Sequence, residues 1–209
     1  IDIISGFTEK KFGANGFYAS PEAIDQYEAT QSSFLGFSTK FKKEKLVVKP
    51  KLYWRRNQDE YVYIRDNPEI YRNLHISNKI YLDLNFIKFY DSGSFSNFGI
   101  DNSQSYISSN NLGPHKRFTS TVYFDHTFNL LNEKLIVSPG FSVSYFSDLS
   151  FHFFPGLDLG FHLSEKSKLY ANFGKTYRIQ TYTDLYYTDR HTIANPDLDH
   201  EHAVSNELG

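Results

Sequence analysis

Hydrophobic and polar residues alternate along much of this chain with a period of two. Between Leu135 and Tyr145, large apolar side chains occupy most odd positions, whereas positions 138, 140, 142 and 144 hold serine or glycine. Residues 157–163 and 169–174 show the same alternation. Because successive side chains of a strand point to opposite faces, this pattern predicts a sheet with one apolar and one polar face.

Repeated along the chain, the alternation predicts ten strands. They are expected at 1–11, 27–41, 45–56, 72–89, 94–104, 117–129, 134–147, 151–163, 168–177 and 203–209. Several exceed ten residues, whereas strands of soluble sheets favour about 5–6 residues and membrane-spanning strands need about 9–11. The one helix candidate is the segment 21–30, because Pro21 suits a first helical position.

The connections between the predicted strands alternate in length. Short polar ones are expected at 42–45, 91–93, 130–133 and 164–167, and longer ones at 12–26, 57–71, 105–116 and 178–202. The connection near Asp148 is the one exception: it is short, although the alternation predicts a long connection there. Outer-membrane barrels place tight turns at one end and long loops at the other. The predicted fold is therefore all-β: an antiparallel up-and-down meander forming a partial transmembrane β-barrel of about ten strands.

The amino-acid composition agrees with a membrane barrel and argues against several other classes of protein. The 209 residues include 20 Phe, 16 Tyr and one Trp, which suits aromatic belts at two membrane interfaces. A tyrosine-rich soluble sandwich remains an alternative. The absence of cysteine excludes disulfides and thiolate metal sites. A net charge of −2 gives no basic face for nucleic acid.

The ends of the chain lead us to expect a piece of a longer protein. The sequence contains no methionine, even at position 1, and residues 1–5 show no signal-peptide pattern.

One polar, aromatic segment carries a family resemblance. Residues 178–201 read RIQTYTDLYYTDRHTIANPDLDHE. This resembles a segment of TonB-dependent outer-membrane receptors that reads R-x-P-[ST]-[YF]-x-[DE]-L-Y-Y and then G-N-P-x-L-K-P-E. The chain departs from it at Gln180, Ala194, Asp199 and His200. Three further stretches resemble the vitamin B12 and siderophore branch of the family: FGANGFYA at 12–19, YWRRNQDEY at 53–61 and YRNLHIS at 71–77.

The resemblance implies a 22-stranded barrel around an N-terminal plug. Residues 1–209 would then be a fragment of that barrel, without the plug and the final strands. It implies a receptor in the bacterial outer membrane that binds a scarce, bulky nutrient on extracellular loops: cobalamin or a ferric siderophore foremost, or haem. The TonB complex would energise uptake through the plug, and outer-membrane lipid would surround the barrel. No enzymatic activity and no cofactor are expected.

Three alternatives remain open at this point. A soluble all-β module that binds a ligand or carbohydrate would pack its apolar face against a second sheet. A passive porin would lack the loop motif. An outer-membrane hydrolase would need a Ser-His or Asp-His arrangement, and no G-x-S-x-G, P-loop or H-E-x-x-H motif is present.

The predicted loops concentrate aromatic and cationic side chains, which suit a large flat ligand with anionic groups. The ligand-binding candidates are Arg56, Tyr61, Tyr63, Tyr71, Arg72, His75, Arg178, Tyr182, Tyr186, Tyr187, Arg190 and His191. Each of these residues could instead have a purely structural role. Tyr186 and Tyr187, like Tyr53 and Trp54, also suit membrane-interface anchors, and Arg178 could tie down its loop through Asp184.

Histidines near the end of the chain raise the question of a metal site. His200 and His202 lie among carboxylates, which are divalent-metal ligand types. No second group of ligands accompanies them, so we predict a solvated polar loop and no metal. His162, on the polar face of its strand, is expected to point into a wet interior.

Overall fold

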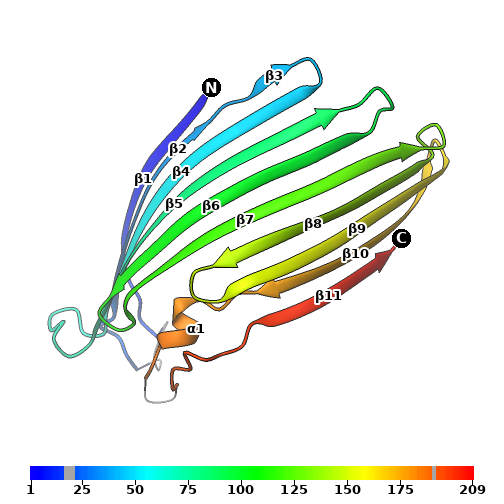
Figure 1. Ribbon diagram of the computed structural model, residues 1–209. Helices are drawn as coiled ribbons and strands as arrows, with labels where there is room; N and C mark the ends of the chain where they lie inside the picture. Colours follow the sequence, from blue (N-terminus) through cyan, green and yellow to red (C-terminus); the bar gives the residue numbers. More distant parts are fainter. Residues whose placement is uncertain (17–21, 190–191) are drawn as a thin grey trace.

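The computed structural model describes residues 1–16, 22–189 and 192–209. They form one antiparallel sheet in which the strands, apart from the small strand β3, pair in the order of the sequence (Figure 1). The strands are β1 (Asp2–Gly13), β2 (Tyr27–Ser38), β3 (Phe41–Lys43), β4 (Leu46–Val62), β5 (Arg72–Phe89), β6 (Phe95–Ser109), β7 (Gly113–Leu130), β8 (Leu135–Phe146), β9 (Ser150–Ser164), β10 (Ser167–Arg178) and β11 (Glu201–Leu208). The small strand β3 pairs only with β4, so β2 and β4 are neighbours. The predicted meander and partial barrel are confirmed.

One face of the sheet, called the outer face, carries the apolar members of the alternation. Cross-strand partners such as Leu52 with Leu82 and Val122 with Val143 continue from strand to strand on this face. These side chains are not packed into a core: Leu82 is 48% exposed and Phe153 is 53% exposed. Among the described residues only Ala14, Val47, Val62, Leu112 and Leu185 are buried hydrophobic residues. An apolar surface of this extent needs an apolar surrounding.

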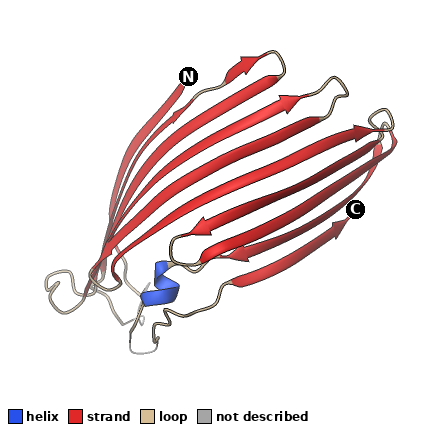
Figure 2. Ribbon diagram, in the orientation of Figure 1, coloured by secondary structure: helices blue, strands red, loops and turns tan. Residues whose placement is uncertain are grey.

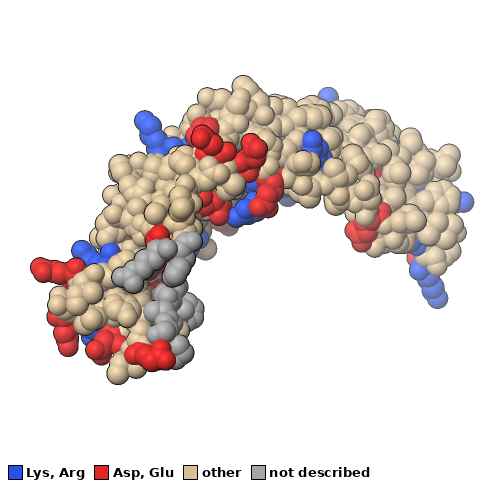
Figure 3. Space-filling model, turned by 90° about the horizontal axis from the view of Figure 1, so that it is seen from below, with Lys and Arg blue, Asp and Glu red and all other residues tan. Residues whose placement is uncertain are grey.

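The opposite, inner face is polar and more crowded. Asp83, Asn85, Ser103, Ser144 and His152 are all buried there. Figure 3, which views the molecule from the end that carries the helix, shows the sheet as an arch with many of the visible acidic side chains on its concave side. Side chains converge on the concave side of a curved sheet, which explains why small polar residues are buried while large apolar ones are not.

Hydrogen bonds link the polar side chains of the inner face across the strands. Lys51 Nζ lies 3.1 Å from Asp83 Oδ2. Asn85 donates to the hydroxyl of Tyr123 at 2.9 Å, and Asn97 donates to Asp125 at 2.8 Å. Each of these groups would cost free energy if it lost water without gaining a partner, so the network accounts for the burial of this face.

The connections sort to two ends, as predicted. Residues 39–45, which include β3, and residues 90–94, 131–134 and 165–166 form the turn end. Of the described residues, 14–16, 22–26, 63–71, 110–112, 147–149, 179–189 and 192–200 form the loop end. The turn after β7 is tight, with positive φ at Leu131, Asn132 and Glu133. The short connection at 147–149, anticipated from the sequence, is also present.

Two of the predicted long connections are shorter than expected. The segment 105–116 contains only a turn at 110–112, and the connection within 57–71 begins after Val62. The strands run further at the loop end because their backbone pairing continues where β4 is polar on both faces, from Arg55 to Glu60. Gln58, for example, pairs with Gln31 and Ile76. Without an apolar face, these strand ends look like loops in the sequence.

The helix predicted at 21–30 is wrong within the described residues, because Tyr27–Thr30 belongs to β2 and residues 22–26 are not helical. The helix that does form, α1 (Tyr182–Tyr186), lies at the loop end (Figure 2). No helix among the described residues has the length and hydropathy to cross a membrane.

Candidate ligand-binding site

The longest loop, residues 179–200, is organised by a capping box at the start of α1. Thr181 accepts a hydrogen bond from the Asp184 backbone at 3.2 Å, and Asp184 accepts one from the Thr181 backbone at 2.8 Å. That backbone hydrogen bond lowers the pKa of Asp184. Arg178 reaches both Asp184 and Glu201 at 3.0 Å. The Arg178–Asp184 pair thus holds α1 to the end of β10, as a structural contact within the loop would. On the other side of the helix, Leu185 is buried.

Arg117, near the start of β7, anchors this loop to the inner face of the sheet. Its Nε lies 2.8 Å from both carboxylate oxygens of Asp148, and its Nη1 donates to the Gln180 backbone carbonyl at 2.8 Å. The guanidinium also lies 5.3 Å from the ring centre of Tyr182. Only 13% of the Arg117 side chain is exposed. One cation therefore joins β7, the β8–β9 turn and the α1 loop.

Aromatic stacking reinforces the same junction. The His115 ring stacks face to face on Tyr186 at 3.7 Å and lies 5.5 Å from Tyr182. The two tyrosine rings are 6.5 Å apart. Burial raises the pKa of the Tyr182 hydroxyl, so this side chain stays uncharged where it packs against the inner face of the sheet.

A second contact joins loops from distant strands. The side chain of Tyr187 in the α1 loop interacts with that of Tyr71, which precedes β5. Tyr71 also packs edge-on against Tyr61, with ring centres 6.3 Å apart. Burial and the Tyr71 contact raise the pKa of Tyr187 to about 12. Because β6 to β9 separate β5 from β10 in the sheet, this contact lets two loops meet across the concave side.

Below these loops, cations line the inner face in one cross-strand row. Arg55 pairs in register with Lys79, Lys79 with Ser105, and Ser105 with Arg117. Arg55 and Lys79 are both exposed. Like charges directly opposite each other destabilise a sheet, so the Arg55–Lys79 pair has an energetic cost that an anion would relieve.

The histidines near the C-terminal end form an aromatic cluster. His152 and His200 pack edge-on with ring centres 4.6 Å apart, and Tyr177 lies 4.9 Å from His200. His202 lies 6.1 Å from Tyr177. Over the described ranges, no group of three or more His, Cys, Asp or Glu residues is arranged to hold a metal. The packing of these rings explains their proximity instead.

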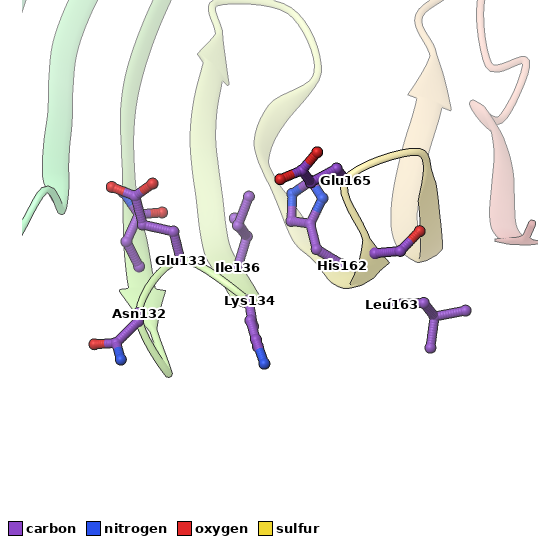
Figure 4. A pocket seen from close by; sticks show the side chains of 9 residues that line it. Asn132, Glu133, Lys134, Ile136, His162, Leu163 and Glu165 are labelled. Carbon is purple, nitrogen blue, oxygen red and sulfur yellow. The ribbon is translucent and has the colours of Figure 1, made fainter.

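A separate open groove of about 660 Å³ lies at the turn end (Figure 4). It is lined by the β7–β8 and β9–β10 turns and the adjoining strand ends, including Glu133, Lys134 and Glu165 of the turns and His162 of β9. It lies at the other end of the sheet from the aromatic and cationic loop residues, so it does not belong to the candidate site.

The matching family model is described as TonB dependent receptor-like, beta-barrel, and it covers residues 5–209. This chain belongs to the TonB-dependent receptor family. The resemblance in its loop segments and the single curved sheet agree with that assignment. The family consists of transport receptors of the bacterial outer membrane, and with its long loops the loop end is the extracellular end of such a barrel.

Solved structures of TonB-dependent receptors share this fold at low sequence identity. The siderophore receptor PirA from Pseudomonas aeruginosa is 12% identical with a TM-score of 0.77, over 88% of this chain and 37% of PirA. PirA from Acinetobacter baumannii is 11% identical with a TM-score of 0.72, over 99% and 38% of the two chains. The Serratia marcescens hemophore receptor HasR, solved with its hemophore HasA and heme, is 13% identical with a TM-score of 0.77, over 99% and 41%.

The chain thus spans less than half the length of these receptors. No curated protein sequence matches it closely enough to serve as a relative.

The predicted site residues of this receptor barrel lie in different parts of the structure. Tyr61, Tyr63, Tyr71, Tyr182, Tyr186 and Tyr187 lie at the loop end, where the structure joins Tyr61 to Tyr71, Tyr71 to Tyr187, and Tyr182 to Tyr186. His75 bonds Ser109 at 2.8 Å on the inner face. Arg190 and His191 lie outside the described residues.

Arg56 and Arg72 are placed differently, on the outer face. Arg56 donates to Gln58 at 3.0 Å, and Arg72 pairs with Glu60 at 2.6 Å. Their role as ligand contacts stays a prediction, but neither side chain faces the concave side of the receptor barrel.

Sequence reasoning missed His115, Lys79 and Arg117, which line the inner face. No local motif marks them, and their common row follows only from the register between strands. The signal available in the sequence was the HKR run at 115–117 directly before an alternating segment. The apolar side chain of Phe118 belongs to the outer face. Because faces alternate along a strand, Lys116 also points outward, whereas His115 and Arg117 point inward.

Proposed function

We propose that this chain forms part of the wall of a receptor that takes up a scarce, bulky, anionic nutrient across the outer membrane. A ferric siderophore or haem is the proposed nutrient. The observation that supports an anionic nutrient most directly is the exposed Arg55–Lys79 pair on the inner face. Arg117 lies in the same cross-strand row. These cations lie just below the tyrosine-rich loops, so an anion bound at the mouth would meet positive charge as it enters.

The tyrosines supply the second half of the proposed recognition. Tyr61, Tyr71 and Tyr187 present rings and hydroxyls from two loops that already touch each other. Aromatic faces with a few directed donors suit ligands with flat rings, such as catecholates or a porphyrin. Two receptors of similar fold support this class, because PirA is a siderophore receptor and HasR was solved with its hemophore and heme.

The remaining steps of uptake belong to the whole receptor. In this proposal a plug inside the barrel receives the nutrient, the TonB complex supplies energy, and no bond of the nutrient is made or broken. Cobalamin, the other nutrient expected from the resemblance, stays a prediction, since no contact described above favours it. The soluble binding module is disfavoured, because among the described residues no second sheet covers the apolar face.

Charge-neutralising variants of the full-length receptor test the proposal. Arg55→Gln combined with Lys79→Gln removes the inner pair, and Arg56→Gln is a matched control one residue away on the outer face. The probes are a ferric tris-catecholate siderophore, haem and cyanocobalamin, each titrated against the purified receptor. We expect at least one anionic probe to bind, and the double variant to weaken it about 10- to 100-fold, which corresponds to the loss of one hydrogen bond from a charged group to the ligand, worth about 1.5–3 kcal/mol.

The control should change that affinity less than about twofold, because Arg56 lies on the opposite face of the sheet from Arg55 and Lys79. Binding of cyanocobalamin alone would contradict the proposal. An equal loss in Arg56→Gln and in the double variant would also contradict it, because the effect would then not come from the inner row.

A further inference from the structure

Two neighbouring positive charges on the inner face have no carboxylate partner among the described residues. Arg55 and Lys79, called the cation pair, lie directly opposite each other on β4 and β5 and are both exposed. Neither forms a salt bridge with a described residue, and Arg55 donates a hydrogen bond to the neutral Asn57 at 3.0 Å. Arg117, in the same row, is held by Asp148 and is only 13% exposed. The row therefore offers a ligand the two adjacent charges of the cation pair, while its third charge is already neutralised.

Aromatic side chains border the cation pair on the side of the turn end. Tyr53 and Tyr81 are partners in the next row of the inner face, about 7 Å away at two residues per step. The rings of Phe34 and Tyr53 are nearly parallel, with ring centres 6.5 Å apart and 25° between their planes. These two rings lean over Gly6 and Gly36 of the neighbouring strands, because an added Cβ at either glycine would contact them. The rings therefore lie along the wall and form an apolar surface beside the two cations.

Carboxylates limit the positive region on both sides. On the inner face of β4 to β6, the next charged row towards the turn end consists of Lys51, Asp83 and Asp101. Lys51 lies 3.1 Å from Asp83, which leaves Asp101 without a salt bridge to a described residue. Towards the loop end, the nearest charged residue of the inner face on these strands is Asp59. Like charges brought together oppose binding, so an anion charged over its whole surface fits this wall less well than one charged at a single edge.

We propose that the cation pair, together with Phe34, Tyr53 and Tyr81, binds a flat apolar ring that carries two carboxylates at one edge. Each member of the cation pair holds one carboxylate, and the ring lies against the three aromatic side chains. Haem has this shape, so the site selects haem over a ferric tris-catecholate, whose negative charge surrounds the metal. The inference rests on the proposed uptake function and narrows it to one class of nutrient.

Haem and its dimethyl ester test the two parts of the site separately, because esterification removes both carboxylate charges and keeps the ring. Each is titrated against the full-length receptor in nanodiscs, with empty nanodiscs as the blank, and a ferric tris-catecholate is the third probe. We expect the wild-type receptor to bind haem at least about 10-fold more tightly than the ester, which corresponds to the loss of one hydrogen bond between charged groups. The tris-catecholate should bind less tightly than haem.

Variants of the two parts should respond differently to the two forms of haem. Arg55→Gln combined with Lys79→Gln should weaken haem binding and leave the affinity for the ester within about twofold, so that the preference disappears. Tyr53→Leu combined with Tyr81→Leu should weaken both forms by the same factor, about 5- to 10-fold. Arg56→Gln, on the outer face, is the matched control and should change neither affinity. Heat-modifiable migration in gels confirms that each variant is folded, and the single variants replace a double one that is not.

Equal binding of haem and its ester by the wild-type receptor would overturn the proposal, as would an unchanged preference in the folded variants that lack the cation pair. Tighter binding of the tris-catecholate than of haem, with dependence on the cation pair, would overturn the inference and leave the proposed uptake function standing. Failure of every anionic probe to bind would overturn both, so the two failures are distinguishable.

Discussion

Neighbouring residues of β8 show how differently the two faces of the sheet are built. Val143 continues an apolar row on the outer face between Val122 and Phe153, and the members of that face remain open to their surroundings. Ser144 points to the inner face, bonds Thr121 at 2.8 Å and is only 6% exposed. In a water-soluble sheet the exposed and buried roles would be reversed. The comparison shows that in this receptor barrel burial marks the polar lining, and exposure marks the surface that lipid covers.

The largest expected effect comes from placing one charge on either face of β8. Val143→Arg should destabilise the folded receptor by about 2–4 kcal/mol, because an arginine on the lipid face near the bilayer midplane carries that cost. Ser142→Arg, one residue away on the inner face, should cost far less. Denaturant titration of the full-length receptor in lipid vesicles measures both. Similar losses for the two variants would remove the distinction between the faces.

A smaller and more local effect is expected from the anchor of the α1 loop. Arg117→Ala removes the links to Asp148, Gln180 and Tyr182, and should lower the opening free energy of segment 179–189 by about 2–3 kcal/mol. Arg56→Ala, an arginine on the outer face, should leave that segment unchanged. Hydrogen exchange of the loop amides gives the comparison. Unaltered protection in Arg117→Ala would show that the loop is held by other contacts.

The smallest effect is expected at the capping box, where pH provides the test. The pKa of Asp184 is lowered in the folded loop, so its carboxylate stabilises α1 at pH values above the ordinary aspartate value of 3.8. That stabilisation is lost as the pH falls through the lowered value. Asp184→Asn should cost about 0.5–1 kcal/mol at neutral pH and make loop protection insensitive to acidification. A loop that loosens equally in acid in both proteins would argue against this cap.

Much of the architecture could be predicted because its cause is local in the sequence. The alternation around Phe141 and Val143 sets both the strand and its face, and the short polar segment at 164–167 sets a turn. The end of β4 was harder, because Arg56 to Glu60 are polar on both faces and their pairing depends on neighbouring strands. Pro21 suggested a helix, but pairing of Tyr27 with Val62 and Gly13 placed the following residues in a strand.

The candidate site was less accessible to sequence reasoning. Tyr71 and Tyr187 were expected in loops and lie at the loop end, yet their contact joins positions more than a hundred residues apart. Their role in ligand binding stays a prediction. Arg55 and Arg56 look alike in sequence, and only the register places one inside and the other outside. Arg117 was missed because its importance comes from three partners on other strands and loops. Long-range register, which no local pattern encodes, accounts for these differences.

The central claim is that the outer face meets lipid and the inner face meets water. Because the chain contains no cysteine, single cysteines can be placed at each position from 140 to 145 of an otherwise cysteine-free receptor and spin-labelled in vesicles. The account predicts that accessibility to oxygen, which is concentrated in the bilayer, peaks at 141, 143 and 145, while accessibility to a water-soluble nickel complex peaks at 140, 142 and 144. The reverse alternation, or none, would contradict it.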